Sequence, residues 1–239
     1  MSNIIQKVKE EIVKPLFFSV FKAGASVKNN AVSSFLIASA YFIKAENEYN
    51  NCGATIFKED RYKLHDFLSR EYLSPDEKIL FFEFGVRWGT IINKWAGHNK
   101  NKESVFAGFD TFTGLPEDWG NVKKGSLSND GEVPTPADER VHFYVGLVQD
   151  TLPVYLSNID ENTKKVIHFD FDLYSATLFS LLQLTGHMKK GDVIIFDQYF
   201  SVTKNHHEYR AFRDYLSVQK LNYIPKYKTR DGKYVIELC

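Results

Sequence analysis

The 239-residue sequence is poor in several features that mark secreted, membrane-spanning or nucleic-acid-binding proteins. It contains only two cysteines, Cys52 and Cys239, and their wide separation argues against a disulfide framework or a CxxC metal site. Thirty Lys and Arg residues balance thirty Asp and Glu residues, and no basic block stands out. Nucleic acid and anionic membranes are therefore not expected partners, and a reducing cytoplasm is the simplest setting.

Long apolar runs are missing as well. The apolar segment Ser33–Ile43 is only about half of the ~20 residues that a membrane-spanning helix needs, so we expect a packed helix and no stable membrane insertion. A peripheral membrane contact through Pro15–Phe21 is the less favoured alternative. The start of the chain, Met1–Glu11, mixes Lys with Glu and does not have the pattern of a signal peptide.

The sequence changes character near the polar segment Asn47–Gly53. We expect residues 1–53 to form a helical appendage and residues 54–239 to form a catalytic domain. The aromatic N-terminal helices are expected to act as a dimerisation element, a substrate lid or both, so a homo-oligomer is predicted.

From Arg61 onward, predicted helices and strands alternate, which is typical of a doubly wound α/β fold with a parallel sheet. The expected strands are Ile79–Glu83, Val105–Asp110, Val141–Val145, Val166–Asp170 and Val193–Asp197, and the expected helices are Tyr62–Tyr72, one starting at Thr90, and Leu178–Met188. Two further strands, Tyr223–Tyr227 and Tyr234–Leu238, flank a turn sequence. They predict a C-terminal hairpin that adds an antiparallel strand.

The run from Ile79 to Thr90 is the most informative segment. Its apolar part stops at Glu83 and passes into a turn that carries Gly85 and Gly89, where glycines let backbone N–H groups approach a ligand. Asp110 follows Gly89 by 21 positions, close to the ~20-residue spacing that places a ribose-binding carboxylate in nucleotide-binding βαβ units. Because the loop is not GxGxxG, an adenosine-containing cofactor without a pyrophosphate fits best.

Two further expected strands end in acids, at Asp170 and Asp197. The carboxyl ends of parallel strands meet at one edge, so these acids should converge with Glu83 and Asp110 on one crevice. Asp170, Asp197 and the side-chain carbonyl of Gln198 make an all-oxygen set that suits Mg²⁺.

The chain resembles the class I S-adenosylmethionine-dependent methyltransferases, and within them the macrocin-type sugar O-methyltransferase family. The resemblance runs from about Arg61 to the C-terminus and rests on five ordered motifs: Glu83–Val86, Phe109–Trp119, Gly146–Pro153, Asp170–Thr177 and Phe196–Tyr199. It implies a Rossmann-like, mostly parallel seven-stranded sheet and methyl transfer to a hydroxyl of a sugar or glycan precursor.

The family pattern also implies roles for individual residues. Glu83, Gly85 and Gly89 would line the methionine end of the cofactor, Asp110 the ribose, and Gln149 and Asp150 the adenine, with further contacts from Val86, Thr90, Thr111, Phe112 and Asp170. It further implies that Asp170 and Asp197 hold Mg²⁺ and act in catalysis. Gln198 stands where many relatives have another acid, and the similar metal-dependent catechol and caffeoyl-CoA methyltransferases have an amide there.

A base must take the proton of the acceptor hydroxyl, and His206 and His207 are candidates in the loop expected after the fifth strand. The polar loop Gly120–Asp138 is predicted to be a lid or disordered. Two other functional classes stay open. Asp170-Phe171-Asp172 could be the DxD motif of a metal-dependent glycosyltransferase, or the chain could be a non-catalytic cofactor-binding subunit.

Overall fold

The computed structural model describes residues 30–201 and 206–239, with side chains from residue 39 onward. The chain divides into two compact units, Met1–Ala40 and Tyr41–Cys239. The expected membrane contact of Pro15–Phe21 lies outside the described residues, as does most of the expected appendage. Helix α3 (Asn30–Asn51) includes the segment predicted to be helical and continues into the polar segment where the sequence changes character. Within the described part of the chain, no helix is long and apolar enough to cross a membrane.

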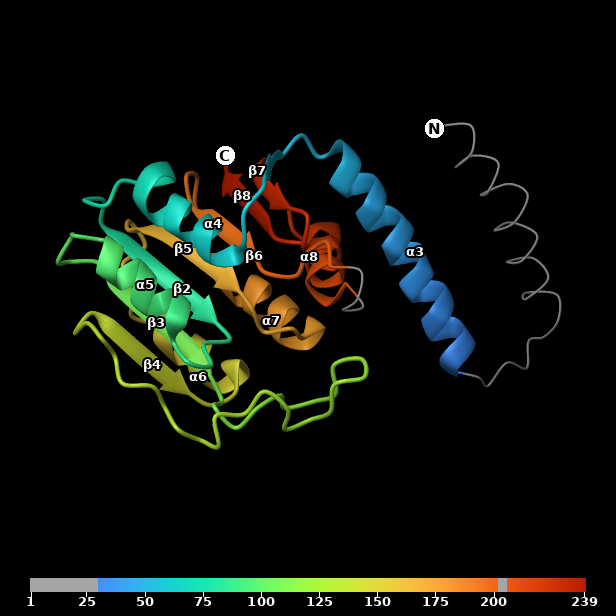
Figure 1. Cartoon of the computed structure of the whole chain (residues 1–239), viewed down its shortest axis with the longest axis horizontal. Coiled ribbons are helices and arrows are strands. Elements are labelled where there is room, and N and C mark those ends of the chain that lie inside the picture. Colours follow the sequence, from blue (N-terminus) through green and yellow to red (C-terminus); the bar gives the residue numbers. More distant parts are fainter. Residues whose placement is uncertain (1–29, 202–205) are drawn as a thin grey trace. The chain divides into compact units, whose positions relative to one another are not determined.

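The second unit contains an eight-stranded sheet in the order β1-β7-β8-β6-β5-β2-β3-β4 (Figure 1). Its strands are β1 (Thr55–Phe57), β2 (Ile79–Phe84), β3 (Val105–Asp110), β4 (Val141–Val145), β5 (Lys164–Phe169), β6 (Val193–Phe196), β7 (Tyr223–Thr229) and β8 (Tyr234–Leu238). All neighbours pair in parallel except β8, which runs antiparallel to both β6 and β7. The mostly parallel α/β sheet with a C-terminal hairpin is therefore confirmed.

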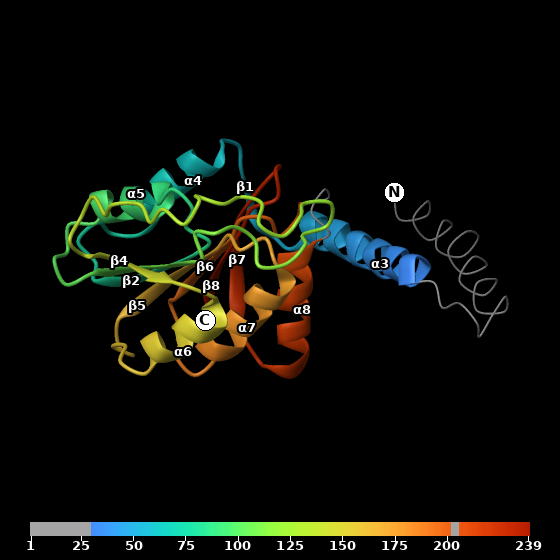
Figure 2. The same ribbon diagram turned by 90° about the horizontal axis from the view of Figure 1, so that it is seen from below.

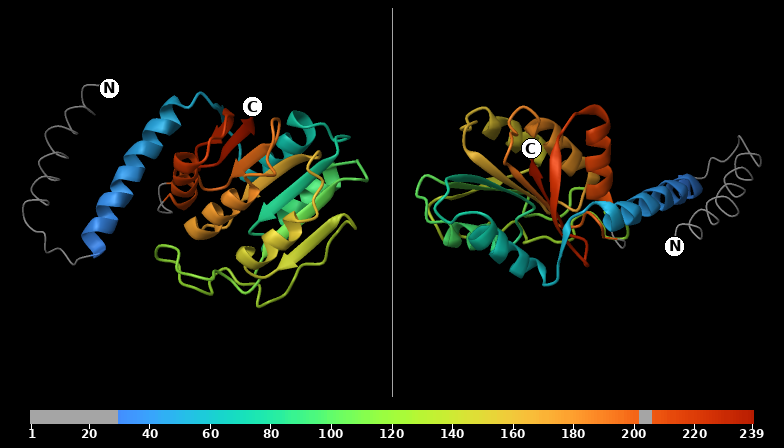
Figure 3. Two further views of the ribbon diagram at one scale, coloured as in Figure 1. Left: turned by 180° about the vertical axis from the view of Figure 1, so that it is seen from behind. Right: turned by 90° about the horizontal axis from the view of Figure 1, so that it is seen from above.

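The strand count differs from the expected seven. Strand β1 adds an eighth strand by pairing in parallel with β7, where Thr55 lies opposite Tyr227. The segment is only three residues long and largely exposed, so it has no apolar run or alternation that marks a strand in a sequence. Figure 3 shows the hairpin of β7 and β8 toward one edge of the sheet and β4 at the opposite edge.

Helices cover both faces of the sheet (Figure 2). Helices α4 (Arg61–Phe67) and α5 (Thr90–His98) lie on one face, and α6 (Val148–Leu156), α7 (Tyr174–Leu184) and α8 (His207–Val218) lie on the other. A π-helical turn, Leu68–Tyr72, extends α4. Helix α7 begins four residues before the predicted Leu178, and α6 and α8 were not predicted. Histidine 207 thus lies at the start of a helix rather than in a loop.

Neighbouring phenylalanines of β2 show how the two-sided core forms. Phe81 packs with Trp95 of α5 on one face, and Phe82 packs with Tyr155 of α6 on the other. Successive side chains of a strand point to opposite faces, so a strand that is covered on both sides must be apolar throughout. All six residues of β2 are buried, including Glu83, which makes this acid an exception that needs a functional or structural reason.

Candidate active site

The carboxyl ends of the parallel strands border a cleft of about 600 Å³. Glu83 from β2, Asp110 from β3 and Asp170 after β5 all line it, together with Gln198 after β6. The convergence of these strand ends, which follows from their common direction, is as the sequence predicted. Asp197 is only 2% exposed and lies behind the cleft lining.

Two glycines shape the turn between β2 and α5. Gly85 has a φ of +90°, and its N–H donates a hydrogen bond to the carbonyl of Phe109 (3.0 Å). A Cβ at position 85 would overlap the backbone carbonyl of Asp170, so the protein's own backbone requires glycine there. Gly89, with a φ of +71°, is the N-cap of α5 and lies outside the cleft lining.

Glu83 joins the cleft to the first turn of α5. Its Oε2 accepts a hydrogen bond from the backbone N–H of Ile92 (3.0 Å), and its Oε1 lies 3.6 Å from Nδ1 of His168. Burial raises the pKa of Glu83 to about 8, against the lowering effects of the Ile92 amide and of Arg61. The carboxyl group is therefore poised to ionise when a cation binds beside it.

Asp110 holds the loop after β2 in place. Its Oδ2 accepts hydrogen bonds from the backbone N–H groups of Val86 and Arg87, both at 2.8 Å, and its Oδ1 accepts one from Phe112 (2.8 Å). A carboxylate has about four acceptor positions, so these bonds leave about one for a ligand hydroxyl. The ribose contact that the family pattern implies for Asp110 would therefore use this remaining position.

The remaining predicted cofactor residues divide into two groups. Val86, Thr90, Thr111 and Gln149 line the cleft. Asp150 lines a separate groove beside β4 and α6, and Phe112 is buried with its ring 5.9 Å from that of Phe143. The adenine contact expected from Asp150 is therefore not supported by its position, whereas Gln149 is well placed.

An ion-pair network borders the cleft. Arg61, at the start of α4, places Nη2 2.7 Å from Oδ2 of Asp170 and Nε 3.6 Å from Oδ1 of Asp197. Lys233 directly precedes β8, and its Nζ lies 3.4 Å from Oδ2 of Asp197. Burial and then the charge of Asp197 raise the pKa of Asp170 well above its ordinary range, and Arg61 opposes this rise.

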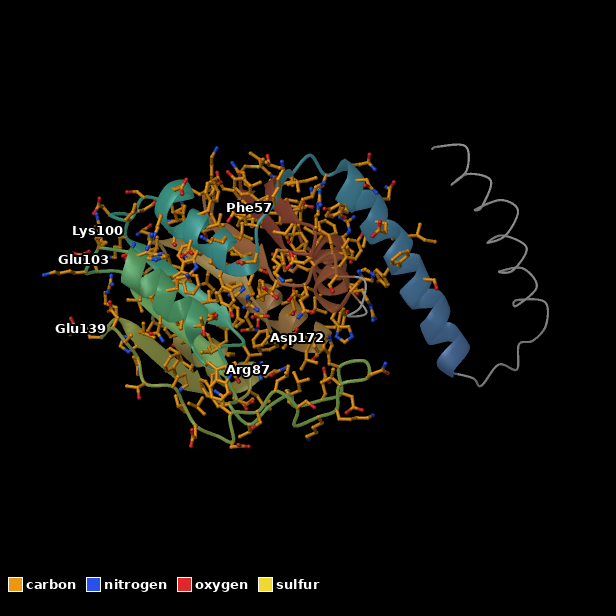
Figure 4. The ribbon with its side chains drawn as sticks, in the orientation of Figure 1. Phe57, Arg87, Lys100, Glu103, Glu139 and Asp172 are labelled. Carbon is orange, nitrogen blue, oxygen red and sulfur yellow. The ribbon has the colours of Figure 1, made fainter. Side chains whose placement is uncertain are left out.

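Asp172 and Gln198 form a second polar pair in the cleft lining. The side-chain amide of Gln198 donates a hydrogen bond to Oδ1 of Asp172 (2.6 Å), and its backbone N–H donates to Glu208 (2.8 Å). Asp172 lies in the loop after β5 and has a left-handed backbone conformation, with a φ of +64°. Figure 4 labels it at the same end of the sheet as Arg87. Asp172 thus lines the cleft with one oxygen bonded to Gln198.

The two histidines proposed as bases lie outside the cleft lining. Nδ1 of His207 accepts a hydrogen bond from the backbone N–H of Tyr174 (3.1 Å), so the neutral ring carries its proton on Nε2. In that tautomer neither nitrogen of His207 can take a further proton without breaking the bond to Tyr174. His206 is buried and its ring lies 5.9 Å from that of Phe42.

Aromatic residues that the sequence did not single out form much of the cleft wall. They are Tyr62, Trp88, Trp119 and Phe171. The predicted loop Gly120–Asp138 is held over this region, since the buried Asn129 donates a hydrogen bond to the carbonyl of Arg87 (2.7 Å), and Leu127 lines the cleft. Trp119 and Phe171 lie within two of the recognised motifs, whereas no local signal marks Tyr62 or Trp88 as part of the cleft wall.

The expected ligands of Mg²⁺ do not form an open oxygen site. Asp170 and Asp197 both contact Arg61, and Gln198 points its amide nitrogen at Asp172. His168, Asp170 and Asp197 can bring one atom each within 4.8 Å of one another, but a fully buried imidazole is a poor ligand for a hard cation that prefers oxygen. The side chains present, with a guanidinium among them, do not fit Mg²⁺.

Comparisons with known proteins agree with this architecture. The family described as Macrocin-O-methyltransferase (TylF) matches residues 135–224. The crystal structure of CalS11, a calicheamicin methyltransferase, matches with a TM-score of 0.55 and 21% identity over 90% of this chain and 95% of that chain. The apo structure of CalS11, described as a TDP-rhamnose 3'-O-methyltransferase, matches with a TM-score of 0.51 and 21% identity over 83% and 93%.

No curated protein sequence matches the chain. At 21% identity the solved structures establish the fold, and the family match adds a sequence relationship over residues 135–224. The chain therefore has the fold of the class I methyltransferases and is similar to the macrocin-O-methyltransferase family, which confirms the resemblance inferred from its motifs.

Proposed function

We propose that the protein is an S-adenosylmethionine-dependent O-methyltransferase that acts on a hydroxyl of a sugar or glycan precursor. The observation that carries the proposal is one cleft that is lined by Glu83, Asp110, Gln149, Asp170 and Asp172. The family match supports methyl transfer, and CalS11, described as a TDP-rhamnose 3'-O-methyltransferase, supports a sugar acceptor.

The bound cofactor would supply a sulfonium that already activates the methyl group, so the protein has to bind, orient and exclude water. Glu83 offers a carboxylate for an ammonium group, and Asp110 keeps one acceptor position for a hydroxyl. Gln149 can contact a base edge, and the indoles of Trp88 and Trp119 provide apolar walls. These contacts account for binding without a phosphate cradle.

The acceptor hydroxyl must lose a proton as its oxygen attacks the methyl group. The Asp172 carboxylate is the group we assign to this proton, because it lines the cleft and Gln198 fixes its Oδ1. The earlier candidates, His206 and His207, lie outside the lining. Magnesium is not included in this mechanism because Arg61 contacts both expected ligands.

The glycosyltransferase alternative finds less support. Asp170, the first acid of the Asp170-Phe171-Asp172 motif, is paired with Arg61, and Phe171 packs on Phe84 with ring centroids 5.2 Å apart. A DxD motif needs accessible carboxylates for a metal and a nucleotide diphosphate. The non-catalytic alternative predicts the same cofactor binding as an enzyme, so only turnover separates those two.

A two-stage experiment tests the proposal. Thermal unfolding is first measured with S-adenosylhomocysteine and, separately, with UDP or GDP plus Mn²⁺. We expect stabilisation by S-adenosylhomocysteine alone, and stabilisation only by a nucleotide diphosphate would contradict the proposal. Radiolabelled methyl transfer is then measured against a panel of nucleotide sugars and free glycosides. Cofactor binding without transfer to any hydroxyl acceptor would favour the binding-subunit alternative.

We also propose that the N-terminal segment, residues 1–53, mediates self-association in a cytoplasmic enzyme. The proposal is based on the aromatic residues of its sequence. Light scattering of the full chain is expected to give a mass larger than that of one chain, and a monomeric mass would contradict it.

A further inference from the structure

A guanidinium lies beside both of the acids that were expected to hold a divalent cation. Nη2 of Arg61 lies 2.7 Å from Oδ2 of Asp170, a distance typical of a charge-assisted hydrogen bond. Its Nε lies 3.6 Å from Oδ1 of Asp197, so one planar cation faces both acids. The Arg61 side chain is 30% exposed and lines the cleft, so part of the guanidinium is accessible to a ligand in the cleft.

Helix α4 fixes this arrangement. Arg61 is the first residue of α4, whose N-cap Asp60 accepts a hydrogen bond from the backbone N–H of Lys63 (3.0 Å). One turn further, Leu64 and His65 are fully buried against the sheet. The N-terminal end of α4 is therefore held by capping and packing, and Arg61 in its first turn borders the cleft at the carboxyl ends of the strands.

A second cation, which is also paired with Asp231, lies beside Asp197. Nζ of Lys233 lies 3.4 Å from Oδ2 of Asp197, on the other oxygen from the one that faces Arg61. The buried acid thus has a positive group beside each oxygen. A buried carboxylate normally needs such compensation, and here two side chains of the protein provide it.

A magnesium ion would compete directly with Arg61. Mg²⁺ binds oxygens at about 2.0–2.1 Å, so an ion held by both Asp170 and Asp197 would lie only a few ångströms from the guanidinium. Like charges at such a distance repel strongly inside a protein, where the effective dielectric constant is about 20. The two cations exclude each other.

We propose that Arg61 replaces the divalent cation at this site, so that the protein binds no Mg²⁺ there and presents a guanidinium to the oxygen of its acceptor. The catalytic half of this inference rests on the proposed function, whereas the exclusion of the metal does not. Gln198 adds no further negative charge beside the two acids, and its amide nitrogen donates to Asp172.

Metal binding tests the exclusion without any assay of turnover. Mn²⁺ is titrated into the wild type and into Arg61→Met, which keeps much of the aliphatic stem and removes the charge, and binding is followed by electron paramagnetic resonance. We expect the wild type to show no Mn²⁺-binding site that is lost in Asp197→Ala. In Arg61→Met the affinity should be more than about 100-fold higher, because the repulsion is removed.

Lys94→Ala is the matched control. Lys94 of α5 is a cation of similar partial exposure, and it is paired with Asp66 of α4, the helix that carries Arg61, at 2.7 Å. This variant should bind Mn²⁺ no better than the wild type. If the wild type binds one Mn²⁺ and Asp197→Ala abolishes that binding, the inference is overturned, even if Arg61→Met does not fold. Equal, weak binding by the wild type and a folded Arg61→Met also overturns it.

Turnover provides a separate readout. EDTA should leave the wild-type rate unchanged, and Arg61→Lys, which keeps one positive charge but not the planar fork, should retain more activity than Arg61→Met. An EDTA-sensitive wild type would overturn the inference while leaving methyl transfer intact. Absence of any transfer by a wild type that excludes Mn²⁺ would instead overturn the proposed function alone.

Discussion

Gly85 lies directly against the backbone of Asp170: a Cβ at position 85 would overlap the carbonyl oxygen of Asp170 and lie 2.7 Å from its carbonyl carbon. Because neither backbone can move without disturbing β2 and β5, we expect Gly85→Ala to destabilise the fold and to weaken the cofactor site only as a consequence. The positive φ costs roughly 1–2 kcal/mol and the overlap roughly 1–3 kcal/mol more. Urea unfolding measures the sum.

Gly125→Ala separates these two contributions. Gly125 has a φ of +83°, and a Cβ there would meet nothing within 4 Å. This variant should therefore lose only the roughly 1–2 kcal/mol due to its φ. Equal losses for Gly85→Ala and Gly125→Ala would show that the contact with Asp170 has no energetic weight.

Asp110→Ala is expected to weaken S-adenosylhomocysteine binding in two ways. It removes one direct acceptor and frees the backbone N–H groups of Val86 and Arg87, which shape the loop. The combined loss should be roughly 1.5–3 kcal/mol, the range for hydrogen bonds to a charged group, measured by calorimetry. Asp110→Asn, which keeps one acceptor oxygen, should lose less. Unchanged affinity in Asp110→Ala would remove this residue from the site.

Glu83 should make both stability and cofactor affinity depend on pH. Its pKa of about 8 in the folded state exceeds the ordinary value of 4.5, so the folded state retains a proton that the unfolded chain releases. This contribution to stability is complete below pH 4.5 and is lost as the pH rises to about 8. Glu83→Gln should flatten the stability profile between these limits in urea unfolding, whereas the exposed variant Glu103→Gln should not.

Cofactor binding gives the opposite dependence at Glu83. An ammonium group beside the carboxylate favours its ionised form, so S-adenosylhomocysteine should bind more tightly as the pH rises toward about 8, with release of a proton. Calorimetry in buffers of different ionisation enthalpy counts that proton. The absence of proton release in the wild type would contradict the role of Glu83.

Asp172→Asn should slow methyl transfer and leave cofactor affinity unchanged. Asparagine tolerates the positive φ of this position, so the loop is kept while the base is lost. General-base catalysis contributes roughly 100-fold to 10,000-fold, and a fall in kcat of that size is expected. His207→Ala is the comparison. It should lower stability modestly, through the lost bond to Tyr174, with kcat nearly unchanged. The reverse ranking of the two rates would make His207 the base.

The strands that form the site were predictable because each is a short apolar run between turn residues. Strands β3 and β4 have the predicted bounds, Val105–Asp110 and Val141–Val145. The convergence of the acids followed from parallel topology alone. Helix α8 was missed because its N-cap is His206, which is not one of the usual capping residue types and has a φ of +51°.

The partners of the acids could not be predicted. Arg61 lies 109 positions before Asp170, and Lys233 reaches Asp197 only because the hairpin returns beside β6. No local pattern encodes which cation will face a given carboxylate. The sequence therefore indicated a cluster of acids and suggested a metal, while long-range packing supplied a guanidinium.

Two of the three tryptophans in the chain, Trp88 and Trp119, line the cleft, and Trp88 is 58% exposed. The third, Trp95, is buried in the core and stacked on Phe81, with ring centroids 4.8 Å apart. Indole emission responds to polarity and to stacking with a heteroaromatic ring, so the cleft carries its own fluorescent reporters above a constant background from Trp95. Ligand titrations can then be followed optically without a label, and comparing Trp88→Phe with Trp119→Phe would tell which wall a ligand approaches.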